Sequence, residues 1–143
     1  MINSLDHITI AVSDIGSAKQ FFTLFGFKVT HDVIIEKEPF SSYMNIKDLK
    51  AQHLTMRQKN SNFEIQLLYF FSPVPQDDPN INRLDKLGYN HICFDVDDVS
   101  ETIDMLKSHG VKILTNIMTF HSRKLVYLEG PDGIIVELAE WLT

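Results

Sequence analysis

The sequence has only one cysteine, no excess of positive charge and no long run of apolar residues. The single cysteine, Cys93, excludes an internal disulfide and fits a reducing compartment. The net charge of −6 argues against a nucleic-acid partner, which requires a basic face. No apolar run approaches the roughly 18 residues of a membrane span, and MINSLDH does not resemble a signal peptide. These absences predict a cytoplasmic protein that uses neither membrane nor nucleic acid.

What the sequence does contain is a repeated pattern. The segments LDHITIAV (residues 5–12) and YNHICFDV (89–96) align without gaps at an offset of 84, since 91 − 7 = 84. Each reads as an alternating strand, and each is followed by an amphipathic helix pattern that stops at a glycine, Gly26 or Gly110. At 143 residues, 44% of them hydrophobic, the chain is predicted to form one domain built from this duplication.

A second correspondence follows at an offset of 71, since 137 − 66 = 71. LTMRQKNSNFEIQLLYF aligns with LVYLEGPDGIIVELAEW, and both segments indicate a β-hairpin. The chain therefore divides into module one, about 5–70, a proline- and asparagine-rich linker, 71–88, and module two, about 89–141. The connection 31–53 has no counterpart in module two, and no structure is predicted for it.

Strand alternation assigns each residue to a face of its sheet. The apolar positions of each strand are expected to pack under the helices, which leaves His7, Gln66, His91 and Glu137 on the opposite face. A lone histidine on a strand is more often core or surface than ligand. Two matching pairs, each an imidazole and an oxygen donor, instead favour a site for one divalent metal, of the kind Zn, Ni, Co, Fe or Mn.

These motifs resemble the vicinal oxygen chelate superfamily, which includes glyoxalase I, methylmalonyl-CoA epimerase, extradiol dioxygenases and bleomycin-resistance proteins. The resemblance rests on LDHITIAVSDI, NHICFDVDDV and GPDGIIVELAE. It implies an α+β fold in which two tandem βαβββ modules form a cupped eight-stranded mixed sheet around the metal site. It also implies a homodimer, and metal ligands at the same four positions.

The function implied is that of a metal-dependent lyase or isomerase. It abstracts a proton next to the carbonyl of a small-molecule substrate, while the metal stabilises an enediolate. Glu137 and Glu64 are the candidate bases, and His121 and Arg123 are candidate substrate contacts. Two alternatives stay open: a resistance-type protein that only sequesters its ligand, and an Fe(II) extradiol dioxygenase.

Overall fold

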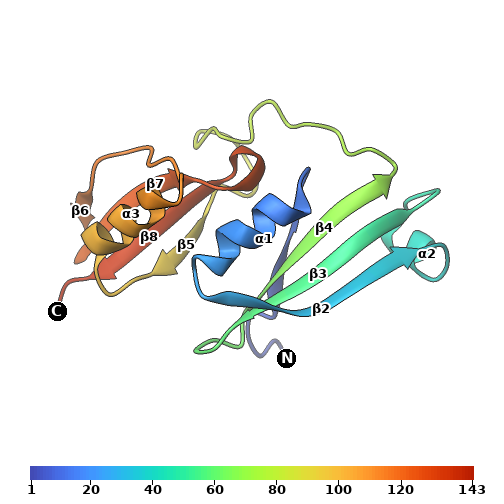
Figure 1. Cartoon of the computed structure of the whole chain (residues 1–143), viewed down its shortest axis with the longest axis horizontal. Coiled ribbons are helices and arrows are strands. Elements are labelled where there is room, and N and C mark those ends of the chain that lie inside the picture. Colours follow the sequence, from blue (N-terminus) through green and yellow to red (C-terminus); the bar gives the residue numbers. More distant parts are fainter. The chain divides into compact units, whose positions relative to one another are not determined.

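The computed structural model describes residues 1–143, which form two compact units, Met1–Asp77 and Asp78–Thr143. The division falls inside the predicted linker 71–88. Each unit contains one four-stranded sheet and one main helix (Figure 1). None of the helices has the length and apolar character needed to cross a membrane.

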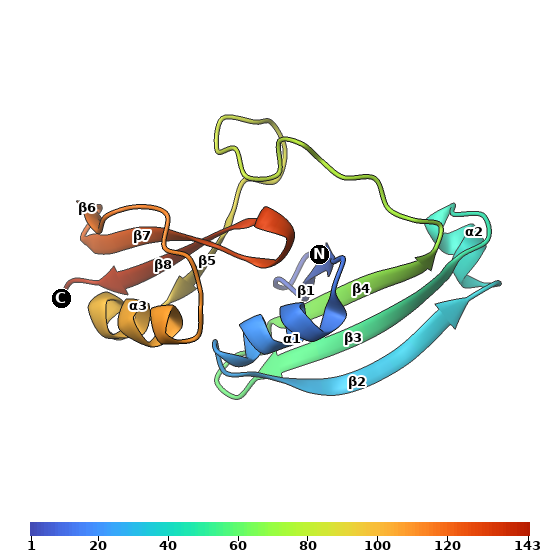
Figure 2. The ribbon, with the colours of Figure 1, turned by 45° about the horizontal axis from the view of Figure 1, so that its top comes forward.

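The first unit is built on a mixed sheet with the strand order β1-β4-β3-β2. The first strand is parallel to the fourth, and the other neighbours are antiparallel. Helix α1 packs against β4 and β2, and the short helix α2 lies at the end of β2 (Figure 2). The elements are β1 (His7–Ala11), α1 (Ile15–Thr23), β2 (Phe27–Glu36), α2 (Phe40–Met44), β3 (Lys50–Gln58) and β4 (Glu64–Ser72).

The second unit repeats this plan with the strand order β5-β8-β7-β6, again with its first strand parallel to its last. Helix α3 packs against β7 and β8. The elements are β5 (Ile92–Asp95), α3 (Val99–Ser108), β6 (Met118–Phe120), β7 (Arg123–Glu129), a 3-10 turn η1 (Pro131–Gly133) and β8 (Ile135–Trp141). The prediction of two tandem βαβββ modules in an α+β fold is thus confirmed.

Both main helices begin and end in the same way. The Asp14 carboxylate accepts a hydrogen bond from the Ser17 amide, 3.0 Å, and Asp98, 84 residues later, accepts one from Glu101, 2.8 Å. Such caps satisfy amides that have no partner inside the helix. Gly26 and Gly110 follow the helices at φ +85° and +83°, a conformation that costs glycine little.

The apolar positions of the strands pack under the helices, as alternation predicts. Ile65 and Leu67 on β4 are fully buried, and so are Val136 and Leu138 on β8. On the helices, Phe22 in α1 and the residues Val99, Ile103 and Leu106 in α3 supply the facing apolar surface. The other face of each sheet carries the polar residues Gln66 and Glu137 beside buried apolar ones, such as Leu68 in the first unit and Ile135 in the second.

The modules differ most in the first hairpin. In module one, β2 has ten residues and β3 nine, so most of the 31–53 connection, for which no structure was predicted, forms strand and helix. In module two, the strand that corresponds to β2 is β6, which has only three residues. The gapless offset of 71 is correct for the last strands but wrong for the strands before them. Thr55 pairs with Gln66 and Tyr127 pairs with Glu137, an offset of 127 − 55 = 72. One residue fewer connects the paired strands in module two.

Candidate functional site

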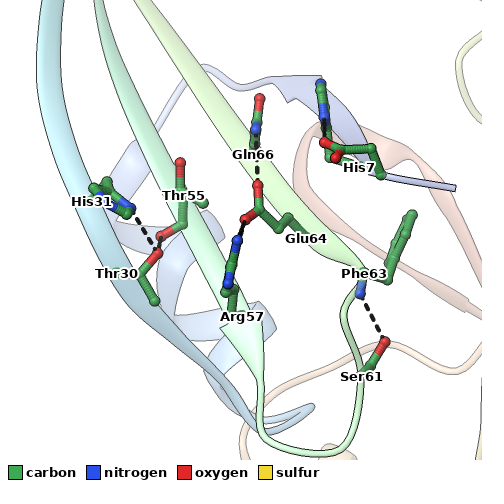
Figure 3. A network of polar contacts seen from close by, with 10 residues as sticks. His7, Thr30, His31, Thr55, Arg57, Ser61, Phe63, Glu64 and Gln66 are labelled. Atoms are coloured by element: carbon green, nitrogen blue, oxygen red, sulfur yellow. Dashed lines mark hydrogen bonds and ion pairs between the residues drawn. The ribbon is translucent and has the colours of Figure 1, made fainter.

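The polar face of the first unit is assembled by β1, β4 and β3. The parallel pairing of β1 with β4 sets His7 opposite Glu64 and Thr9 opposite Gln66. The side chain of His7 is 40% exposed and that of Glu64 is 12% exposed. The structure therefore brings His7, Glu64 and Gln66 to one sheet face, as the sequence predicts (Figure 3).

The Gln66 amide is held by three side chains. Its oxygen accepts a hydrogen bond from the Thr9 hydroxyl, 3.3 Å, and lies 3.1 Å from His53 Nε2, while its nitrogen donates to Glu64, 3.1 Å. Because the amide oxygen can only accept, His53 donates through Nε2. Sequence reasoning assigned no role to His53. Its place beside Gln66 follows from the antiparallel register of β3 with β4, which no local pattern revealed.

Glu64 is engaged by an arginine from the neighbouring strand. Arg57 Nε donates to Glu64 Oε2 at 2.5 Å, and a second guanidinium nitrogen forms an ion pair with the same oxygen (Figure 3). The hydrogen bond from Arg57 is the main cause that lowers the pKa of the Glu64 carboxyl, followed by that from Gln66. A carboxylate stabilised in its charged form is a weaker proton acceptor, so the structure gives little support to Glu64 as a base.

His7 also contacts the residue that precedes it. Its Nδ1 lies 2.5 Å from a carboxylate oxygen of Asp6. One ligand atom from each of Asp6, His7 and Glu64 lies within 4.8 Å of the others, so these three residues form a possible cation group within the first unit. Both carboxylates of the group already have partners, His7 for Asp6 and Arg57 for Glu64.

The polar face of the second unit centres on His91 and Glu137. Glu137 lies on β8, and His91 immediately precedes β5. His91 Nε2 and Glu137 Oε1 are 3.4 Å apart, with side chains 28% and 12% exposed. The parallel pairing of β5 with β8 places Cys93 opposite Glu137, and β7 places Tyr127 opposite it from the other side.

Cys93 and Tyr127 form the immediate surroundings of the carboxylate. Burial first, and then the hydrogen bond and charge of Glu137, raise the pKa of the Cys93 thiol to about 12. Burial, followed by the charge of Glu137 and a hydrogen bond to it, also raises the pKa of Tyr127. Both groups therefore stay protonated at neutral pH. The His91 ring meets the Tyr127 ring edge-on, with centroids 5.2 Å apart.

The two candidate substrate contacts lie at the start of β7. His121 is exposed in the turn between β6 and β7, at φ +50°, beside the ring of Phe120. Arg123 pairs with Trp141 and lies over its ring, 4.7 Å from the centroid, with a buried Nε that has no hydrogen-bond partner. Arg123 shares the sheet face of Tyr127, four residues before it, whereas nothing brings His121 to Glu137.

The donors of the second unit fit a divalent transition metal. Two ligands at the usual zinc distances of about 2.0–2.2 Å, arranged tetrahedrally, lie about 3.4 Å apart. The separation of His91 Nε2 and Glu137 Oε1 is 3.4 Å. Imidazole and carboxylate without thiolate match the metals Zn, Ni, Co, Fe and Mn. The amide oxygen of Gln66 also fits, provided that it gives up one of its two hydrogen bonds on binding.

Comparison with known proteins identifies the family. The model described as "Glyoxalase/Bleomycin resistance protein/Dioxygenase superfamily" matches residues 4–138. The chain belongs to this superfamily. The resemblance inferred from the repeated motifs is thereby confirmed.

Individual relatives in the superfamily are distant. The chain is 27% identical to a lactoylglutathione lyase of Schizosaccharomyces pombe over 94% of its own length but only 46% of the relative. It is 28% identical to an ethylmalonyl-CoA/methylmalonyl-CoA epimerase of Cereibacter sphaeroides, covering 98% of this chain and 99% of that one. A crystal structure of a glyoxalase family protein from Bacillus cereus superposes with a TM-score of 0.92 at 24% identity, covering 100% and 97% of the two chains. The chain thus spans about half the length of the yeast enzyme but nearly all of the epimerase.

Proposed function

We propose that this protein is a metal-dependent lyase or isomerase that removes a proton next to the carbonyl of a small-molecule substrate. The activities named for the yeast and bacterial relatives, lactoylglutathione lyase and methylmalonyl-CoA epimerase, support this class. The observation that carries the proposal is the His91–Glu137 pair, whose nitrogen and oxygen face each other at the separation of two ligands on one ion. Its counterpart in module one is His7 with Gln66.

In this proposal each module supplies one half-site, a histidine and an oxygen donor: His7 with Gln66, and His91 with Glu137. Two half-sites together would hold one divalent transition metal. His7 and His91 would bind it through nitrogen, and Gln66 and Glu137 would bind it through oxygen. When bound, the metal supplies a Lewis acid that stabilises the negative charge developing on the substrate oxygens. Because Gln66 is neutral, the donor set carries only one negative charge against the dication.

Glu137 is the proposed base. It is a carboxylate on the site face, and its ion-pair partner is His91, the proposed metal ligand beside it. Glu64, the other candidate, is tied to Arg57. A ligand carboxylate has two oxygens, so Glu137 is able to contact the metal and take a proton from the carbon next to the carbonyl. Arg123 on β7 is the proposed contact for an acidic group of the substrate. His121, in the turn just before β7, is the second proposed substrate contact.

Metal titration of chelator-treated protein tests the ligand set. We expect about one ion per chain for the wild type, and at least tenfold weaker binding, about 1.4 kcal/mol, for His7→Ala and for His91→Ala. His109→Ala is the matched control, because His109 caps the end of α3 and contacts Met105 O. Wild-type affinity in both site variants would show that the ligand set is wrong.

Solvent deuterium exchange tests the chemistry. Methylmalonyl-CoA and lactoylglutathione each carry a hydrogen next to a thioester carbonyl, and the metal-loaded protein is expected to exchange it in at least one of them. Adding a chelator should stop the exchange. Metal binding without exchange in either compound would leave the ligand set standing and reject these two substrates.

A homodimer is also proposed, from the family resemblance. Light scattering at tens of micromolar should give a mass near 33 kDa, since 2 × 16.5 = 33. A mass of 16.5 kDa under these conditions would contradict it.

A further inference from the structure

The residue that precedes each proposed histidine ligand contacts that histidine. Asp6 and Asn90 are related by the same offset of 84 as the histidines, since 90 − 6 = 84. An oxygen of Asp6 lies 2.5 Å from His7 Nδ1, and the amide oxygen of Asn90 lies 2.8 Å from His91 Nδ1. Two independent half-sites therefore repeat one arrangement: a side-chain oxygen against Nδ1.

The direction of both hydrogen bonds follows from the partners. An ionised carboxylate only accepts, so His7 donates to Asp6 through Nδ1. For Asn90, the amide nitrogen donates to the backbone oxygen of Leu84 at 2.7 Å, which turns the amide oxygen toward His91. His91 therefore also donates through Nδ1. In the neutral imidazole the proton on Nδ1 leaves the lone pair on Nε2, the nitrogen that faces Glu137 in the second unit.

We infer that Asp6 and Asn90 are positioning residues, which fix the Nδ1–H tautomer and the ring direction of the two histidines and so present both Nε2 atoms to a metal. This inference rests on the proposed function for its purpose, but the hydrogen bonds are its evidence. A partner of this kind orients a ligand and raises its basicity, and its loss typically weakens metal binding about 10- to 100-fold.

Asp6 has a second possible role, because its carboxylate belongs to the group of three with His7 and Glu64. The chain itself shows how to separate the two roles. Module two has an amide at the matching position, so an amide suffices to accept from Nδ1. If Asp6 positions His7, an asparagine there should serve nearly as well. If Asp6 binds the metal directly, loss of its negative charge should weaken binding clearly in the asparagine variant too, although an amide oxygen can still bind.

The first experiment needs no metal. Long-range ¹⁵N–¹H correlation spectra of the metal-free protein at pH 8 report which ring nitrogen carries the proton, with assignments from His7→Gln and His91→Gln. We expect the Nδ1–H form for both histidines in the wild type. Asp6→Ala should shift His7 alone toward the Nε2–H form, and Asn90→Ala should shift His91 alone. Asp104→Ala, which removes an exposed carboxylate from α3, should shift neither.

The second experiment measures affinity for Zn²⁺ by competition with a chromophoric chelator. Asp6→Ala should weaken binding about 10- to 100-fold, whereas Asp6→Asn should change it by less than about threefold. A loss of tenfold or more in Asp6→Asn would overturn the positioning role and make Asp6 a ligand. The Nε2–H form for both histidines in the wild type would also overturn it, whether or not metal binds. Failure of the wild type to bind any metal, with the Nδ1–H forms observed, would reject the proposed function and leave the tautomer assignment intact.

Discussion

The polar faces of the two modules share a strand plan but differ in how their oxygen donors are held. In the first unit, Gln66 is neutral and its amide contacts three polar side chains, in a network that ends at Arg57. In the second unit the oxygen donor is a carboxylate, Glu137, and its main polar neighbours are His91, Cys93 and Tyr127. The position that matches Glu64 is Ile135, which is 3% exposed.

This difference distinguishes a side chain that only binds the metal from one that also accepts a proton. A neutral amide fixed by several hydrogen bonds makes a steady ligand, but it cannot take a proton. A carboxylate that is not paired with an arginine is able to do both. The two modules therefore have similar strand arrangements, and we expect the chemistry to depend on which oxygen donor each module carries.

The largest expected effect comes from making the two oxygen donors alike. Glu137→Gln should slow solvent deuterium exchange into substrate at least 100-fold, because general bases contribute about 10²–10⁴-fold, while most metal affinity remains. Adding Gln66→Glu to that variant should not restore exchange, since the new carboxylate would lie beside Glu64. Glu129→Gln, at the exposed end of β7, is the control. Exchange at the wild-type rate in Glu137→Gln would contradict the assignment of the base.

The next effect concerns stability and compares equivalent core positions. Leu67 and Leu138, at the offset of 71, both have 0% exposure. Each change to alanine should destabilise its own unit by about 2–5 kcal/mol. Hydrogen exchange followed by mass spectrometry should show lost protection in residues 1–77 for Leu67→Ala and in 78–143 for Leu138→Ala. Leu87→Ala, at a fully exposed position, should change neither. Equal loss in both units for each variant would contradict this division.

The smallest expected effect tests the ion pair that only module one has. Arg57→Met should lower the free energy of unfolding of metal-free protein by less than about 1 kcal/mol at pH 7, since Arg57 is more than half exposed. Arg57 depresses the pKa of Glu64 below 4.5. The contribution is therefore present above that value and is lost as the pH falls through the folded pKa.

Denaturant unfolding at pH 7 and pH 3 measures this contribution, with Lys28→Met on the neighbouring strand as the control. The difference between the wild type and Arg57→Met should shrink at pH 3. A larger difference at pH 3 than at pH 7 would contradict the claim that the ion pair stabilises the protein only while Glu64 is ionised.

The sequence was sufficient to predict the modules, the ends of the two main helices and the faces of the strands. Alternation decides which residues are buried, and burial of Leu67 and Leu138 is what fixes the opposite face for Gln66 and Glu137. The stops of both helix patterns at Gly26 and Gly110 were likewise visible, because a helix end is a local feature. The metal ligands and substrate contacts assigned on those faces remain predictions.

What the sequence did not reveal are contacts that depend on register between strands. His53 meets Gln66 only because of the antiparallel pairing of β3 with β4, and that pairing depends on the number of residues between the paired strands. A difference of one residue there made the offset of 71 fail for β7. The Glu64–Arg57 contact could not be predicted either, because it depends on the same pairing of β3 with β4.

The parallel pairing of the first and last strands has a consequence for where the chain can be divided. Since β1 pairs with β4 and β5 with β8, every strand ladder closes within one module, and a break within residues 73–88 would cut no ladder. Each half would then carry its full set of strand partners. Separately expressed fragments 1–77 and 78–143 should accordingly each keep their strand ladders, and hydrogen exchange of each fragment measures this.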